Sequence, residues 1–142
     1  MQELTFESTL ALILAKDPRY QRDAYLFVKD ALDHTQKLVL KENKGELRHV
    51  SGQELLAGIR EYALTQFGPM TQMVFEEWGI KRCEDFGEIV FNMVEIGLLG
   101  KTDKDSREDF ANGYDFEDAF RKPFLPTSRI KAIQDQPKSA EA

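Results

Sequence analysis

The sequence has one cysteine, Cys83, and two histidines, His34 and His49, in 142 residues. A single cysteine excludes a disulfide within the chain and a zinc site built on cysteines, and it fits a reducing compartment. The two histidines lie in different segments, so their spacing gives no support to a metal site. The sequence therefore predicts neither a metal nor any other cofactor.

Long apolar runs are also missing. No window of the sequence approaches the roughly 18 uncharged apolar residues that a membrane span needs. The first residues, 1–7, lack the basic region and the unbroken apolar stretch of a signal peptide. We therefore expect a cytoplasmic protein that does not enter a membrane.

Positive charge is scarce in one segment of the chain. The formal net charge is -6, and residues 76–118 hold 13 acidic and 5 basic side chains. Because attraction to phosphate rests on clustered Lys and Arg, this balance argues against a general nucleic-acid binder or a binder of anionic membranes. It indicates an acidic surface that suits a basic protein partner.

What the sequence does contain is helical periodicity. With 42% hydrophobic residues the chain can form one core, and we expect a single domain over residues 1–125 and a disordered tail over 126–142. Apolar spacing predicts helices over residues 4–15, 22–40 and 51–67, and two more after Gly68 and Gly79. The predicted fold class is mainly α, with a minor β element where residues 98–102 form a short strand.

Local signals define the ends of the central helices. Ser51 and Glu54 have the spacing of a capping box at a helix start. Gly68 suits the end of that helix, and Pro69 suits the first position of the next one. We expect the next helix to bury a face made of Met70, Met73, Val74 and Trp78.

The segment after residue 102 carries short-range signals of helical turns. Asp105 or Ser106 is placed to cap one turn, and Asp115 is placed to cap another. Aromatic side chains are too numerous here to remain in water. We expect three of them in the core, namely Phe110, Phe116 and Phe120.

Residues 51–102 have the order helix, corner, helix, turn, helix, which resembles the centre of a helix-turn-helix or winged-helix domain. In such a domain the third helix lies in the major groove and offers Arg, Asn, Gln or Lys to base edges. Here the third helix is apolar around most of its circumference, and its polar stripe consists of Glu84, Glu88, Asn92 and Glu95. Only Asn92 has the chemistry of a base reader, so a nucleic-acid-binding regulator is an alternative and not the main prediction.

The acidic stripe is the predicted partner-binding surface. Phe124, which lies between Pro123 and Pro126, is a second candidate because aromatic side chains often anchor partners. The sequence therefore predicts, first, a small protein-interaction or regulatory module that presents an acidic face to a basic partner.

A third function rests on the helix start at Ser51. Arg48, His49, Ser51 and Gly52 combine two basic side chains, the positive end of a helix dipole and a glycine that permits close approach, which is chemistry suited to a small anion or a nucleotide. The competing explanation is that Ser51 and Glu54 only cap the helix, with the negative charge of Glu54 already at that end. Capping alone explains the spacing, so anion binding stands behind the other two functions.

The sequence gives no ground for predicting an enzyme. It contains no Walker loop, no dinucleotide fingerprint and no Gly-x-Ser-x-Gly elbow. Cys83, at a helix start, is expected to be a small packed residue and not a nucleophile. No catalytic residue is predicted.

Five phrases of the sequence carry a resemblance to a family. They are KDPRY at residues 16–20, RHVSGQELL at 48–56, QFGPM at 66–70, DFGEIVF at 85–91 and YDF at 114–116. Together they resemble a family of small bacterial proteins found notably in planctomycetes and verrucomicrobia, and the resemblance covers about residues 10–125. Because no activity is established for that family, the resemblance implies no catalytic residues.

Overall fold

Helices make up nearly all of the ordered architecture. The computed structural model describes residues 6–45, 49–100, 105–111 and 113–125, so the predicted tail lies outside the described residues. Five α-helices are present in this part of the chain, namely α1 (Phe6–Lys16), α2 (Arg22–Glu42), α3 (Gly52–Phe67), α4 (Thr71–Glu77) and α5 (Cys83–Glu95). Four short helical turns accompany them, namely η1 (Gly68–Met70), η2 (Arg107–Phe110), η3 (Glu117–Arg121) and η4 (Lys122–Phe124). The mainly α fold class is confirmed.

Two of the predicted helix caps are present in the structure. The Ser51 hydroxyl accepts a hydrogen bond from the Glu54 N–H at 3.2 Å, and the Glu54 carboxylate accepts one from the Ser51 N–H at 3.1 Å. The same reciprocal arrangement joins Ser106 and Asp109 at the start of η2. Both boxes satisfy backbone N–H groups that have no partner within the helix itself.

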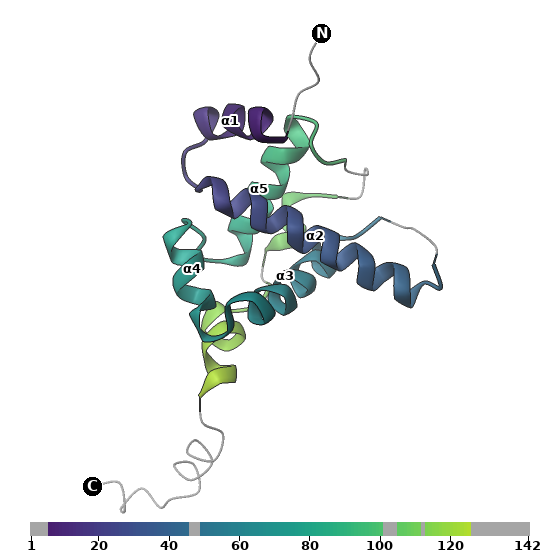
Figure 1. The fold of residues 1–142 in the computed structure, drawn as a ribbon, viewed down its shortest axis with the longest axis vertical. Coiled ribbons are helices and arrows are strands. Elements are labelled where there is room, and N and C mark those ends of the chain that lie inside the picture. Colours follow the sequence, from purple (N-terminus) through teal and green to yellow (C-terminus); the bar gives the residue numbers. More distant parts are fainter. Residues whose placement is uncertain (1–5, 46–48, 101–104, 112, 126–142) are drawn as a thin grey trace, which may run out of the picture.

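The helices are stacked around α2, which runs across the front of the molecule in Figure 1. In that view α5 lies behind α2, α3 lies below it, α1 lies above it, and α4 lies to the left. The short turns η3 and η4 follow at the lower end, where η3 packs against α4 and α3. This arrangement encloses the core between α2, α3, α4 and α5.

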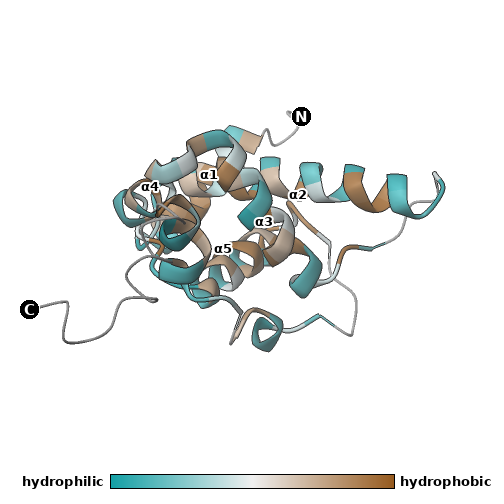
Figure 2. Ribbon diagram, turned by 90° about the horizontal axis from the view of Figure 1, so that it is seen from below, coloured by the Kyte–Doolittle hydropathy of each residue, from teal (hydrophilic) through white to brown (hydrophobic). Residues whose placement is uncertain are grey.

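An aromatic cluster forms the centre of this core. Phe75 of α4 is fully buried, and four phenylalanine rings have centroids 5.2–5.8 Å from its own, those of Phe27, Phe86, Phe116 and Phe120. These rings come from α2, α5 and the segment around η3, so Phe75 ties together elements that are distant in the sequence. In Figure 2 the hydrophobic stretches of the ribbon lie mainly where the helices face one another, and the hydrophilic stretches lie mainly on the outer sides. The predicted burial of Phe110, Phe116 and Phe120 is confirmed.

The minor β element is absent from the part of the chain that the structure describes, and the strand prediction is wrong for residues 98–100. The backbone N–H groups of Leu98 and Leu99 both donate to the Met93 carbonyl, at 2.9 and 3.3 Å. Gly97 has a φ of +85°, and it turns the chain back over the end of α5. These residues therefore cap a helix, and residues 101 and 102 lie outside the described ranges.

The buried face predicted for the helix after Gly68 is wrong at Met70 and Met73, whereas Val74 and Trp78 are half-buried and Trp78 packs against the core. Met70 and Met73 are 49% and 61% exposed, whereas Thr71 and Phe75 are fully buried. The reason is the tight turn η1, because residues 68–70 wind as a 3-10 helix before α4 begins. The Thr71 hydroxyl donates to the Gly68 carbonyl at 2.7 Å and to the Ala63 carbonyl at 3.2 Å, which fixes Thr71 and Phe75 on the inner side.

Candidate functional sites

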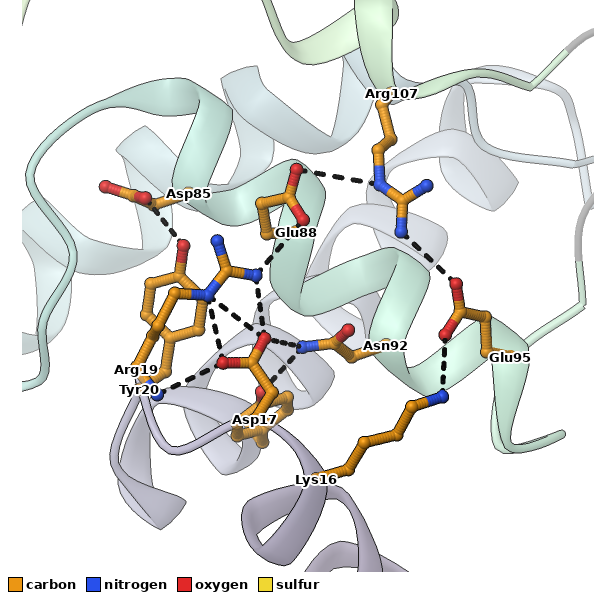
Figure 3. A network of polar contacts seen from close by, with 10 residues as sticks. Lys16, Asp17, Arg19, Tyr20, Asp85, Glu88, Asn92, Glu95 and Arg107 are labelled. Atoms are coloured by element: carbon orange, nitrogen blue, oxygen red, sulfur yellow. Dashed lines mark hydrogen bonds and ion pairs between the residues drawn. The ribbon is translucent and has the colours of Figure 1, made fainter.

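The polar stripe of α5 contacts the loop between α1 and α2 (Figure 3). The Asn92 side-chain amide donates to Asp17 at 2.9 Å and to the Tyr25 hydroxyl at 3.0 Å. The Arg19 guanidinium donates to the Asp17 carboxylate at 2.7 Å and to Glu88 at 3.2 Å. The polar side chains of α5 therefore bind a loop of their own chain.

The Asp17 carboxylate is the centre of this network. The hydrogen bonds from the Arg19 side chain, supported by the Asn92 amide, hold the pKa of Asp17 well below its usual range. A lowered pKa in the folded state means that this carboxylate stabilises the fold at pH values above its unfolded pKa near 3.8. That stabilisation is lost as the pH falls from there through the lowered pKa, because the folded state must then take up the proton that the unfolded state has already bound.

At the C-terminal end of the stripe, the charge of Glu95 is also compensated by basic side chains of the same chain. Glu95 is paired with Lys16 at 3.6 Å and with Arg107 of η2 at 3.3 Å. Arg107 also reaches Glu88 at 3.6 Å, and its guanidinium lies 5.2 Å from the centroid of the Phe91 ring. Three basic side chains from outside α5 thus compensate the charge of Glu88 and Glu95.

The residues that were predicted to bind a partner fall into two groups, according to whether they already have a partner within the chain. Glu88, Asn92 and Glu95 all have partners within the chain. Glu84 forms no ion pair with another described residue, and Phe124 is 43% exposed at the end of η4. Partner binding at these five positions stays a prediction. Of the five, Glu84 and Phe124 are the two that a partner could contact without displacing a hydrogen bond or ion pair between described residues.

Sequence reasoning missed the partners of the stripe. The helix predicted over residues 4–15 stops before residues 16–20, which enter the prediction only through the family resemblance, and no role is predicted for Arg107. A usable signal was present, because a basic–acidic–basic phrase at residues 16–19 carries the charges that complement an acidic helical stripe. The pairing of Tyr20 with Asp85, at 2.6 Å between the hydroxyl and the carboxylate, has no comparable sequence signal.

A cavity of about 370 Å³ lies at the start of α3, between α2, α5 and η2. His49, Ser51 and Gly52 all line it, so the structure brings together three of the four residues that were predicted to bind an anion. The fourth, Arg48, lies outside the described residues. Asp105, Ser106 and Asp109 face them from the other side.

The charge around this helix start is negative among the described residues. The Glu54 carboxylate is hydrogen-bonded to the Ser51 N–H, and the Asp105 carboxylate lies 2.6 Å from the His49 imidazole. A Cβ atom on Gly52 would come within 2.7 Å of the Asp109 Cβ, so the glycine allows η2 to pack against α3. Anion binding here stays a prediction, and these contacts explain Ser51 and Gly52 without it.

Cys83 is buried at the start of α5. Its thiol lies 3.3 Å from the Tyr114 carbonyl oxygen, and burial raises the pKa of the thiol to about 11. A thiol with this pKa is almost wholly protonated at neutral pH and is a poor nucleophile. The expectation that Cys83 is a packed residue is confirmed.

Within the described ranges, no group of three or more His, Cys, Asp and Glu side chains has the arrangement of a metal site. None of the helices in this part of the chain is both long and apolar enough to cross a bilayer. No protein family, curated protein or solved structure with which we compared the chain matches it. The family resemblance of the five sequence phrases stays a prediction.

Proposed function

We propose that this protein is a small cytoplasmic interaction or regulatory module that meets a basic partner through the outer α4 face, defined here as Met70, Met73, Glu76 and Glu77. The observation that carries the proposal is the exposure of the two methionines, 49% and 61%. Methionine side chains are flexible and polarizable, and they are common at surfaces that bind other proteins. Covering them with a partner removes apolar surface from water.

The acidic residues of this face support a basic partner. Met73, Glu76 and Glu77 follow one another at the spacing that places side chains on one side of a helix. Glu76 and Glu77 are exposed, and neither forms an ion pair with another described residue. Their charge is therefore uncompensated within the described chain, in contrast to that of Glu88 and Glu95.

The chemistry of the face defines the partner class. Two apolar side chains followed by two carboxylates match a segment that carries an apolar patch beside Lys or Arg. Electrostatic attraction of this kind speeds association and selects the partner, whereas the buried apolar side chains supply most of the affinity. We therefore expect a basic, amphipathic protein segment.

The helix-turn-helix arrangement of α3, α4 and α5 is part of this proposal, as a scaffold that presents α4. The nucleic-acid alternative gains no specific support, because Asn92 donates to Asp17 and Tyr25 and is therefore not free to read a base edge. A DNA reader would also bring Glu84 and Glu88 toward phosphate, which repels them.

Affinity purification of the full chain from cells of its source organism tests the proposal. We expect wild-type protein to retain a reproducible basic partner that moderate salt weakens, because salt screens exposed charges. The variant M70S/M73S should lose that partner. The matched control is L12S, because Leu12 is 54% exposed and belongs to α1, not to α4.

The outcomes separate clearly. Loss of the partner in M70S/M73S together with retention in L12S supports the outer α4 face. Recovery of no reproducible partner, or equal recovery by all three proteins, would contradict it. Circular dichroism of each variant shows that the helical fold is intact before recoveries are compared.

A further inference from the structure

The described chain ends close to the outer α4 face. The turn η3 packs against α4 and against η1, which carries Met70. The turn η4 follows η3 directly, and the last described residue, Leu125, comes next. In Figure 1 both turns lie below α4. The chain that continues from Leu125 therefore starts beside this face.

Exposed apolar side chains are concentrated in the same part of the molecule. Among the described residues, five large hydrophobic side chains are exposed. Four of them belong to η1, α4 or the end of η4, namely Met70, Met73, Phe124 and Leu125, and the fifth is Leu12 of α1. Because covering apolar surface is favourable, a segment that docks on the molecule gains most here.

The sequence that follows Leu125 has the chemistry that this face calls for. Residues 126–142 lie outside the described ranges, and we define the basic segment as residues 129–133, which read RIKAI. The basic segment combines two isoleucines with an arginine and a lysine, and no acidic residue lies anywhere in 126–134. It therefore has the apolar and basic side chains that complement two methionines and two carboxylates.

The basic segment is also within reach. It begins four residues after Leu125 and ends eight residues after it. An extended chain covers about 3.3–3.6 Å per residue, so its members can lie up to about 13–28 Å from Leu125. The seven residues of α4 are only about 10 Å long. The connection is long enough to lay the basic segment along α4.

We infer that the basic segment covers the outer α4 face in the free protein, with Ile130 and Ile133 against the methionines and the two cations beside Glu76 and Glu77. A second copy of the chain is a worse occupant, because a symmetric contact would place these carboxylates against their like-charged equivalents. The inference rests on the proposed function and adds its regulation. A basic partner must displace the chain's own basic segment.

A weak contact is sufficient for this regulation. A tethered segment has an effective concentration in the millimolar range, so a contact with an intrinsic Kd below about 1 mM keeps the face covered most of the time. A face that is open about one-fifth of the time binds its partner about fivefold more weakly than an open face does. The I130S/I133S variant should therefore bind the partner about fivefold more tightly than wild type.

Methionine-methyl NMR of the purified full chain tests the contact without any partner. Met70 and Met73 report on the face, and Met93, which is fully buried in α5, reports on the core. The I130S/I133S variant should move the Met70 and Met73 signals and leave the Met93 signal in place. The R129Q/K131Q variant should move the same signals in the same direction, and so should added salt in wild type, because salt screens the attraction.

Two controls identify the occupant. The Q134S/Q136S variant changes the same stretch of chain without removing an apolar or charged side chain, and its methionine signals should match those of wild type. A synthetic peptide of residues 126–142, added at millimolar concentration to I130S/I133S, should return the Met70 and Met73 signals toward their wild-type positions.

Unchanged Met70 and Met73 signals in I130S/I133S would overturn the inference. Wild-type signals that move on dilution would also overturn it, because the occupant would then be a second copy of the chain. Partner recovery by I130S/I133S that does not exceed that of wild type would contradict the regulation. The proposed function fails separately, when no partner is recovered through the outer α4 face, and that result leaves the NMR comparison intact.

Discussion

Replacement of Phe75 by alanine is expected to lower the free energy of unfolding by about 3–5 kcal/mol, the range found when large aromatic side chains are removed from well-packed cores. Phe75 is fully buried, and its ring contacts aromatic rings from three other segments of the chain. The change removes apolar burial and leaves a cavity at the point where α2, α5 and η3 meet. The free energy of unfolding of a domain of this size is small, so we expect this loss to leave the F75A variant close to unfolding.

Urea denaturation followed by circular dichroism measures this loss. M73A is the matched control, because Met73 lies on the same helix but is 61% exposed, and it should change the free energy by less than about 0.5 kcal/mol. A loss below about 1 kcal/mol in F75A would mean that α4 does not hold the centre of the core.

Replacement of Gly58 by alanine is expected to have the second large effect on the free energy of unfolding. Whether this free energy rises or falls tests the close contact between α2 and α3. Helix propensity alone predicts a gain of about 1 kcal/mol, because alanine is favoured over glycine inside a helix. In this structure, however, a Cβ atom on Gly58 would overlap the Thr35 hydroxyl and would lie 2.9 Å from the Thr35 Cβ. Thr35 is buried on α2, so α2 and α3 must move apart, and we expect a net loss of about 2 kcal/mol.

The double variant G58A/T35A tests the assigned contact. Thr35→Ala removes the hydroxyl nearest to the new methyl group, so the double variant should recover part of the stability that G58A loses, measured against T35A alone. Urea denaturation of wild type and the three variants gives this comparison. A gain in stability for G58A, or no recovery in the double variant, would contradict the close approach of α2 and α3.

Much of the fold follows from short-range signals in the sequence. The capping box at Ser51 and the breaks at Gly68 and Gly79 define their helices because the groups that satisfy a helix end lie within a few residues of it. The burial of Phe110, Phe116 and Phe120 follows from hydrophobicity. These features depend on local chemistry, which a sequence displays directly.

The misplaced features lie at helix ends, where a short stretch of sequence is compatible with more than one backbone conformation. Met70 and Met73 were assigned to the core because the register was counted from Pro69 as a regular α-helix, whereas the turn η1 rotates α4 so that Phe75 points inward. Residues 98–100 resemble a strand by composition but complete hydrogen bonds at the end of α5. In both cases a local pattern allowed two conformations, and packing selected between them.

The candidate site shows the same limit. The acidic stripe of α5 was identified correctly as a stripe, but its partners were sought outside the chain. Asp17 and Arg19 lie some seventy residues before Asn92 and Glu88, and the hydrogen bonds between them are made only when α1, α2 and α5 assemble. Whether a charged face is free or occupied is decided by the tertiary structure, which the sequence pattern does not display.

The central claim is that the polar stripe of α5 binds its own chain and leaves partner binding to another surface. A double-mutant cycle between Asp17→Ala and Asn92→Ala, measured by urea denaturation at pH 7, tests this claim most directly. The Asn92 amide and the ionised Asp17 carboxylate form a charge-assisted hydrogen bond that is largely shielded from water. We therefore expect a coupling free energy of about 1–2 kcal/mol. Losses that add to within about 0.3 kcal/mol would contradict this claim, because they would show that the Asp17 and Asn92 side chains do not interact.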